Sequence, residues 1–146
     1  MTTYHEDLRD AARAAGQVAN YCDRGDHNET VNGSWVIGAG ETFRMLAVRI
    51  AMREGVNLQD AYANRLEAIE ARNVAGTAVD YDGPAEARAA VTWRDLQGVQ
   101  LRHDRQYHPD VIGLHKSEQL RHYSFHLSKL VGALAEEPSE PDQHHD

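Results

Sequence analysis

Apolar side chains recur every three or four residues through most of this chain, the spacing that places them on one face of an α-helix. Five segments show the pattern: residues 4–22, 34–54, 57–72, 84–107 and 110–135. No segment alternates apolar and polar residues as a half-buried strand would. The pattern therefore predicts an all-α fold, built as a compact bundle of about five helices.

Local signals at the segment ends support these helices. Thr3 and Glu6 have the spacing of a capping box, in which each side chain binds a backbone N–H at a helix start. Pro84 suits the first turn of the fourth helix, and Gly55 and Pro109 suit the ends of the second and the fourth. The first segment is rich in alanine, so we expect that helix to pack closely against a neighbour.

The last ten residues differ in character from the rest of the chain. Residues 137–146 are prolines, acids, histidines, serine and glutamine, with no apolar side chain to bury. Such a composition predicts a disordered acidic tail. The remaining residues, 1–136, are of the length of one helical domain.

The net charge and the composition limit the kinds of molecule that we expect the protein to bind. The formal net charge is −8, which repels a phosphate backbone, so we expect no nucleic acid partner. The first residues lack the blocks of a signal peptide, and no apolar run reaches the roughly 20 residues that cross a bilayer. The sequence thus predicts a cytoplasmic protein without a membrane partner. Its alanine-rich faces would suit a homo-oligomer such as a dimer.

Histidines provide the main candidate chemistry. Five of the nine lie in one stretch: His103, His108, His115, His122 and His126. On a helix over residues 110–135, His122 and His126 each fall within about 20° of His115, inside the apolar arc. His122 and His126 are also one turn apart, the spacing by which a helix presents two nitrogens to one ion. We therefore predict a divalent metal held by His122 and His126 with His115 or His103.

Two other interpretations of the histidines remain open. Buried imidazoles need hydrogen-bond partners, so the same residues would suit a structural network without metal. A different helix phase would instead place them along a surface groove. Near the end of the fourth helix, Asp104 is expected to be a surface charge, and Trp93 is expected to anchor the core.

Several charged residues are candidates for further members of the site. Glu54 lies in phase with the apolar face of its helix, which makes it a candidate metal ligand. Glu118 is within reach of the histidine face and is a candidate catalytic residue. Lys129 borders that face, either as a snorkelling stem or as a catalytic anion contact. Glu67 points away from the apolar stripe of the third helix, and Glu70 lies at its border.

The segment QLRHYSFHLSKLVGALAE, residues 119–136, resembles the helix endings of MazG-like nucleotide pyrophosphohydrolases. That resemblance implies an oligomeric helical bundle that uses magnesium held by acidic residues to split nucleoside triphosphates. Glu67 and Glu70 are the only pair similar to the family's acids, and the outward facing of Glu67 departs from the pattern.

The histidine pair in the same segment resembles the metal-binding helix of DinB-like four-helix bundles. In that family three histidines bind a divalent metal, and His122 and His126 match two of them. The resemblance implies a third histidine from an earlier helix. Segments 34–54 and 57–72 contain none, and His27 lies in a loop.

These observations lead to one main hypothesis and two rivals. The main hypothesis is a metal-dependent hydrolase acting on a phosphorylated small molecule such as a nucleotide, with a divalent metal as cofactor. The first rival is a non-enzymatic binding or regulatory module with a structural histidine network. The second is an iron-dependent redox enzyme, since imidazole suits several metals. Whether the protein is an enzyme stays open at this level.

Overall fold

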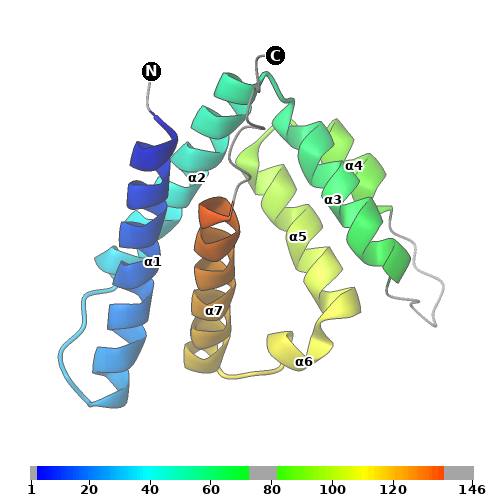
Figure 1. Ribbon diagram of the computed structural model, residues 1–146. Helices are drawn as coiled ribbons and strands as arrows, with labels where there is room; N and C mark the ends of the chain where they lie inside the picture. The colour runs from blue at the N-terminus through cyan, green and yellow to red at the C-terminus, as the bar shows by residue number, and fades with distance from the viewer. Residues whose placement is uncertain (1–2, 73–81, 137–146) are drawn as a thin grey trace. The chain divides into compact units, whose positions relative to one another are not determined.

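The computed structural model of the protein describes residues 3–72 and 82–136 (Figure 1). Within these ranges every regular element is a helix, which confirms the predicted all-α class. The helices are α1 (Tyr4–Asp26), α2 (Ser34–Glu54), α3 (Leu58–Arg72), α4 (Gly83–Ala89), α5 (Trp93–Tyr107), α6 (Pro109–Ile112) and α7 (Lys116–Ala135).

The described residues form seven helices rather than about five, because two predicted helices are interrupted. The fourth breaks at Ala90, whose backbone is extended (φ −63°, ψ 134°). Thr92 and Asp95 then form a second capping box that starts α5. The predicted fifth helix breaks between Ile112 and Lys116, so His115 precedes α7 instead of lying on it.

The capping box predicted at the start of α1 and the glycine predicted to end α2 act as expected. Glu6 Oε2 accepts the N–H of Thr3 at 2.7 Å, and Thr3 Oγ1 accepts the N–H of Glu6 at 3.2 Å. Gly55 adopts a left-handed backbone with φ 64°, which glycine tolerates better than other residues. There the N–H of Val56 reaches back to the carbonyl of Ala51 at 2.8 Å, as in a Schellman motif.

The structure consists of two compact units, and the first comprises Met1–Leu46 and Leu120–Asp146. It contains α1, the first part of α2 and most of α7. Its core joins the three helices through Ala14, Val18 and Ala39, packed against Phe43, Leu120 and Leu127. Alanines of α1 and α2 are buried in this core, and the close packing expected of α1 stays a prediction. Arg121 of α7 donates a hydrogen bond to Asp26 of α1.

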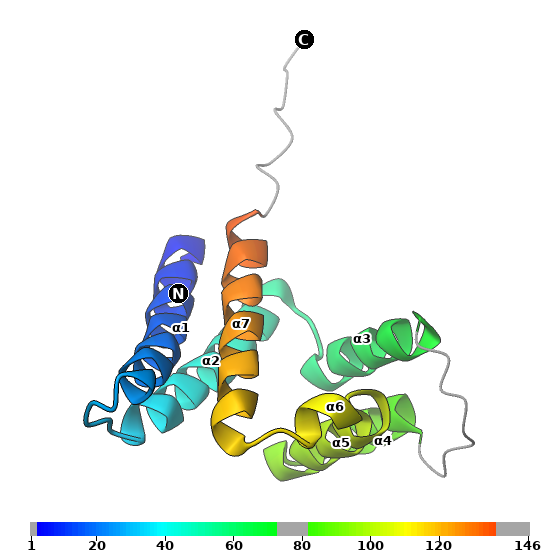
Figure 2. The ribbon, with the colours of Figure 1, turned by 90° about the horizontal axis from the view of Figure 1, so that it is seen from below.

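The second unit, Ala47–Gln119, holds the end of α2 and the helices from α3 to α6. In it α4 packs against both α3 and α5, and α6 packs against α5. Helices α3 and α5 run in the same general direction (Figures 1 and 2). The core of this unit is formed by Ala63, Leu66, Ala87 and Val99, with Tyr62 and Leu96 packed against them.

Two sequence predictions concern features at the limits of the described chain. In residues 3–72 and 82–136, no helix is long and apolar enough to cross a membrane. The predicted acidic tail, residues 137–146, lies outside the described residues. The assignment of residues 1–136 to a single domain stays a prediction.

Candidate metal centre

His103 is the buried centre of a polar cluster in the second unit. It lies on α5 one turn after Val99, so it continues the apolar face that packs against α3, and it is only 2% exposed. Its Nδ1 atom is 3.1 Å from Oε1 of Glu70 on α3, whose side chain is 18% exposed. When Nδ1 donates its proton to this carboxylate, Nε2 keeps the lone pair that a metal needs.

Asp104 and His108 complete a group of three ligands around His103. One ligand atom from each of these residues lies within 4.8 Å of the others. Asp104 is half-buried and His108 is exposed. The backbone at His108 is no longer helical (φ −132°, ψ 47°), as the following proline favours. Its ring centroid thereby comes within 5.5 Å of that of His103.

A chain of hydrogen bonds holds Asp104 from the side of α3. Tyr62 donates to Oε1 of Gln100 at 2.6 Å, and Nε2 of Gln100 donates to Oδ1 of Asp104 at 2.8 Å. Burial raises the pKa of Tyr62 to about 12, and the negative charges of Asp104 and Glu70 add to the effect. Tyr62 therefore stays protonated at neutral pH and remains a donor.

Tyr107 covers another side of the cluster. Its ring centroid lies 4.8 Å from that of His103. Burial, followed by the charge of Glu70, raises the pKa of the Tyr107 hydroxyl. The cluster therefore combines two imidazoles, two carboxylates and two protonated phenols. One of the imidazoles, that of His103, is fully buried. Chemically, this arrangement suits a cation held by nitrogen and oxygen together.

The predicted histidine ligands are distributed over both units. His103 belongs to the second unit, whereas His122 and His126 belong to the first. These two face each other on α7, with 3.0 Å between their Nε2 atoms. His115 is exposed, and its Nδ1 atom is 2.8 Å from Oγ of Ser117.

The predicted buried stripe of three histidines is wrong, because His115 and His126 are exposed. The side of α7 that packs in the core is defined by Leu120, Ser124 and Leu127. Ser124, on this side, is 6% exposed. The histidine pair lies about 200° to 240° around the helix from Leu120.

The other predicted site residues lie at the surface. Glu54 does not point inward, since its side chain is 59% exposed and accepts a hydrogen bond from Arg53 at 3.2 Å. The helix ends directly after it, so neighbouring helices do not cover it. Glu118 and Lys129 are exposed as well. Their roles as ligand or catalytic residue stay predictions.

Sequence reasoning missed Glu70, Asp104 and His108 as members of a site. The sequence pattern places Glu70 only at the border of its stripe and predicts that Asp104 is a surface charge. One signal was present in the sequence: His108 precedes Pro109, and the resulting break in the helix turns its ring toward His103. The partner of His103 on α3 is 33 residues away in the chain, so no local pattern indicated it.

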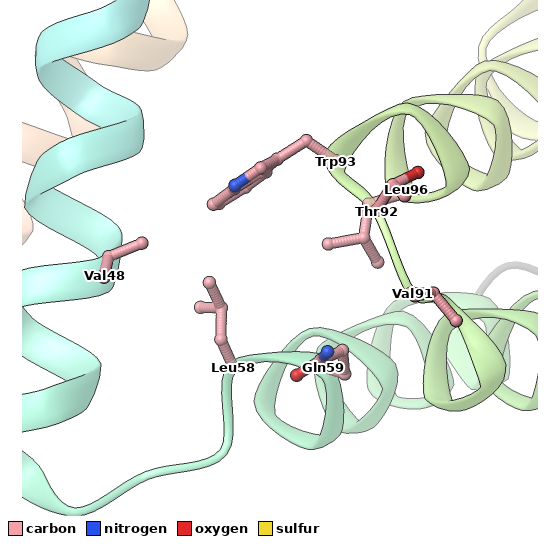
Figure 3. Close-up of a pocket in the computed structure, with 7 residues that line it drawn as sticks. All are labelled: Val48, Leu58, Gln59, Val91, Thr92, Trp93 and Leu96. Atoms are coloured by element: carbon pink, nitrogen blue, oxygen red, sulfur yellow. The ribbon is translucent and has the colours of Figure 1, made fainter.

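A pocket of about 240 Å³ also lies in the second unit (Figure 3). It is lined by Val48, Leu58, Gln59, Val91, Thr92, Trp93 and Leu96. The Trp93 ring borders the open space, and Trp93 is 37% exposed, so it is less of a core anchor than predicted. This lining has no acid, base or thiol, and the Thr92 hydroxyl caps α5.

Known proteins offer no guide to the activity of this site. No protein family, curated protein or solved structure matches the chain. The resemblances to MazG-like pyrophosphohydrolases and DinB-like bundles therefore stay predictions.

Proposed function

We propose that the protein binds a divalent metal through His103, Asp104 and His108, with Glu70 orienting His103. The observation that carries the proposal is that one ligand atom from each of these three residues lies within 4.8 Å of the others, while Nδ1 of the buried His103 is 3.1 Å from Glu70. Metal-binding histidines commonly use their second nitrogen in this way. Without a metal, His103 is a buried polar group, and such a group costs free energy unless it has a partner. Its contact with Glu70 already reduces that cost.

We further propose that the metal serves hydrolysis of a phosphorylated small molecule such as a nucleotide. Two histidines and one carboxylate are the ligands of many hydrolytic zinc sites, which keep a further position for water. Metal-bound water becomes a nucleophile near neutral pH. Because Glu70 and Asp104 would repel a phosphate, we expect substrate binding to need the metal's positive charge.

A second candidate function, an iron-dependent redox enzyme, is favoured by the same set of ligands. Two histidines with one carboxylate also form the facial triad of non-haem iron(II) enzymes. The identity of the metal that the protein binds therefore decides between hydrolysis and redox chemistry. Zinc or manganese would favour hydrolysis, and iron(II) would favour redox chemistry.

The test is the metal content of the full-length protein purified without chelator and then dialysed separately against zinc, manganese and iron(II). We expect metal at the α5 site in the wild type and its loss in His103→Ala and Asp104→Asn. His115→Ala is the matched control, since His115 is an exposed histidine of the same unit. Circular dichroism verifies that each variant folds.

Two results would count against the proposal. Equal metal content in the wild type, His103→Ala and Asp104→Asn would place the metal elsewhere. No bound metal under any of these conditions would leave the cluster as a structural network and favour a non-enzymatic binding module. If metal binds, phosphate release from nucleotides and simple phosphate esters, measured with and without it, tests the hydrolase part.

A further inference from the structure

The histidine pair on α7 has the geometry of a metal chelate. The Nε2 atoms of His122 and His126 are 3.0 Å apart, and their rings meet at 69° with centroids separated by 4.6 Å. A tetrahedral zinc ion, with Zn–N bonds of about 2.0–2.1 Å, holds two nitrogens about 3.3 Å apart. The pair therefore needs to open by only a few tenths of an ångström to bind the ion through both rings.

This pair supplies only part of a coordination sphere. The sole cluster of three or more potential ligands in the described residues is the one around His103, so the described chain gathers no third carboxylate, thiol or imidazole at the α7 pair. Zinc bound there would have two protein ligands out of the four it usually takes in a closed site. Ligands from outside the described residues must complete the coordination sphere.

The surroundings of the pair suit a second copy of the chain. The pair lies away from the side of α7 that packs in the core, and His126 is exposed. Tyr123 and Leu130, next to His126 at helical spacing, are 41% and 54% exposed. A two-fold axis beside α7 would bring the same apolar residues and the same two imidazoles from a partner to the ion.

We propose that His122 and His126 form a second metal site, in which one zinc ion joins two copies of the chain through four imidazoles. Ligands that are all nitrogen favour zinc, copper and nickel over magnesium or manganese. The cluster on α5, by contrast, combines nitrogen with carboxylate oxygen.

The proposal is tested by the mass of the full-length protein in sedimentation and light scattering, with zinc and with EDTA. We expect a dimer with zinc and a monomer with EDTA, and a monomer in both conditions for His126→Ala and for His122→Asn. His126→Ala should lose one zinc ion per two chains relative to the wild type. If His126→Ala and His122→Asn have circular dichroism spectra like that of the wild type, misfolding is excluded as the cause of the lost dimer.

Three control variants separate this site from other histidines. His5→Ala removes an exposed histidine of α1, and His144→Ala with His145→Ala removes the pair near the C-terminus. All should keep the zinc-dependent dimer. His103→Ala should keep it too, so a failure of the function proposed above leaves this result unaffected.

Either of two outcomes would overturn the proposal. One is a monomer that binds a full equivalent of zinc and loses it in His126→Ala, because the coordination would then be completed by water. The other is a zinc response that His126→Ala and His122→Asn leave unchanged.

Discussion

Replacing Glu70 by alanine tests the contact on which the proposed metal centre depends. The substitution removes the acceptor 3.1 Å from Nδ1 of His103 and leaves that nitrogen in a side chain only 3% exposed, where water has little access. A buried polar group that loses its partner costs about 1–3 kcal/mol. At about 1.4 kcal/mol for each factor of ten, the unfolding constant should rise about 5- to 150-fold.

The assay is urea unfolding of metal-free protein, followed by circular dichroism. Glu67→Ala is the matched control, since Glu67 lies one turn earlier on α3 and its side chain, 54% exposed, pairs with Arg88 at 2.8 Å. Surface ion pairs contribute little, so this control should unfold close to the wild type. Glu70→Gln keeps a carbonyl acceptor and should recover much of the loss.

In the presence of metal, the same variant has a second expected effect. Removing the carboxylate that orients a metal-binding histidine typically weakens metal affinity by about 10- to 100-fold. Glu67→Ala should leave the affinity unchanged. The reasoning is refuted if Glu70→Ala unfolds like Glu67→Ala and also binds metal like the wild type.

Four further predictions concern the fold. Thr92→Ala should destabilise the protein by about 1 kcal/mol in thermal unfolding, because it removes the cap of α5. Hydrogen bonds from the backbone N–H groups of Thr92 and its predecessor lower the pKa of Asp95. Its stabilisation should thus be present above about pH 4 and disappear as pH falls through the lowered pKa, so wild type and Asp95→Asn should converge in acid unfolding curves. Gly55→Ala meets no atom within 4 Å but must keep φ 64°, so a loss of about 1–2 kcal/mol in urea unfolding is expected, and no loss would contradict the left-handed turn. Leu66→Ala in the core should cost about 2–5 kcal/mol, whereas Leu101→Ala, at a residue that is 43% exposed, should cost well under 1 kcal/mol. Equal losses would place Leu66 outside the core.

Much of the helical structure followed from local patterns. The capping box at Thr3, the glycine at position 55 and Pro84 near the start of α4 act within a few residues, so their effect can be predicted from the sequence. The break before α5 had the same kind of signal, since Thr92 and Asp95 have capping-box spacing. It was missed because the apolar stripe continues across it.

The pairing of the two histidines on α7 also depends only on residues that are close in the chain. Residues four apart on a helix are neighbours whatever surrounds the helix, so the sequence alone indicated that His122 and His126 would meet. It did not determine which side of α7 is buried. That side carries the buried Ser124 beside Leu120 and Leu127, and a count of apolar residues does not reveal a buried serine.

By itself, then, the sequence determined the all-α class, most helix ends and the pairing of two histidines, because each depends on neighbours in the chain. Only the tertiary structure decided that His103 meets Glu70, since these residues are 33 positions apart and belong to different helices. It also decided that Asp104 is held through Gln100 by Tyr62 of α3. Contacts between helices depend on packing, and packing selects among faces that the sequence pattern leaves open.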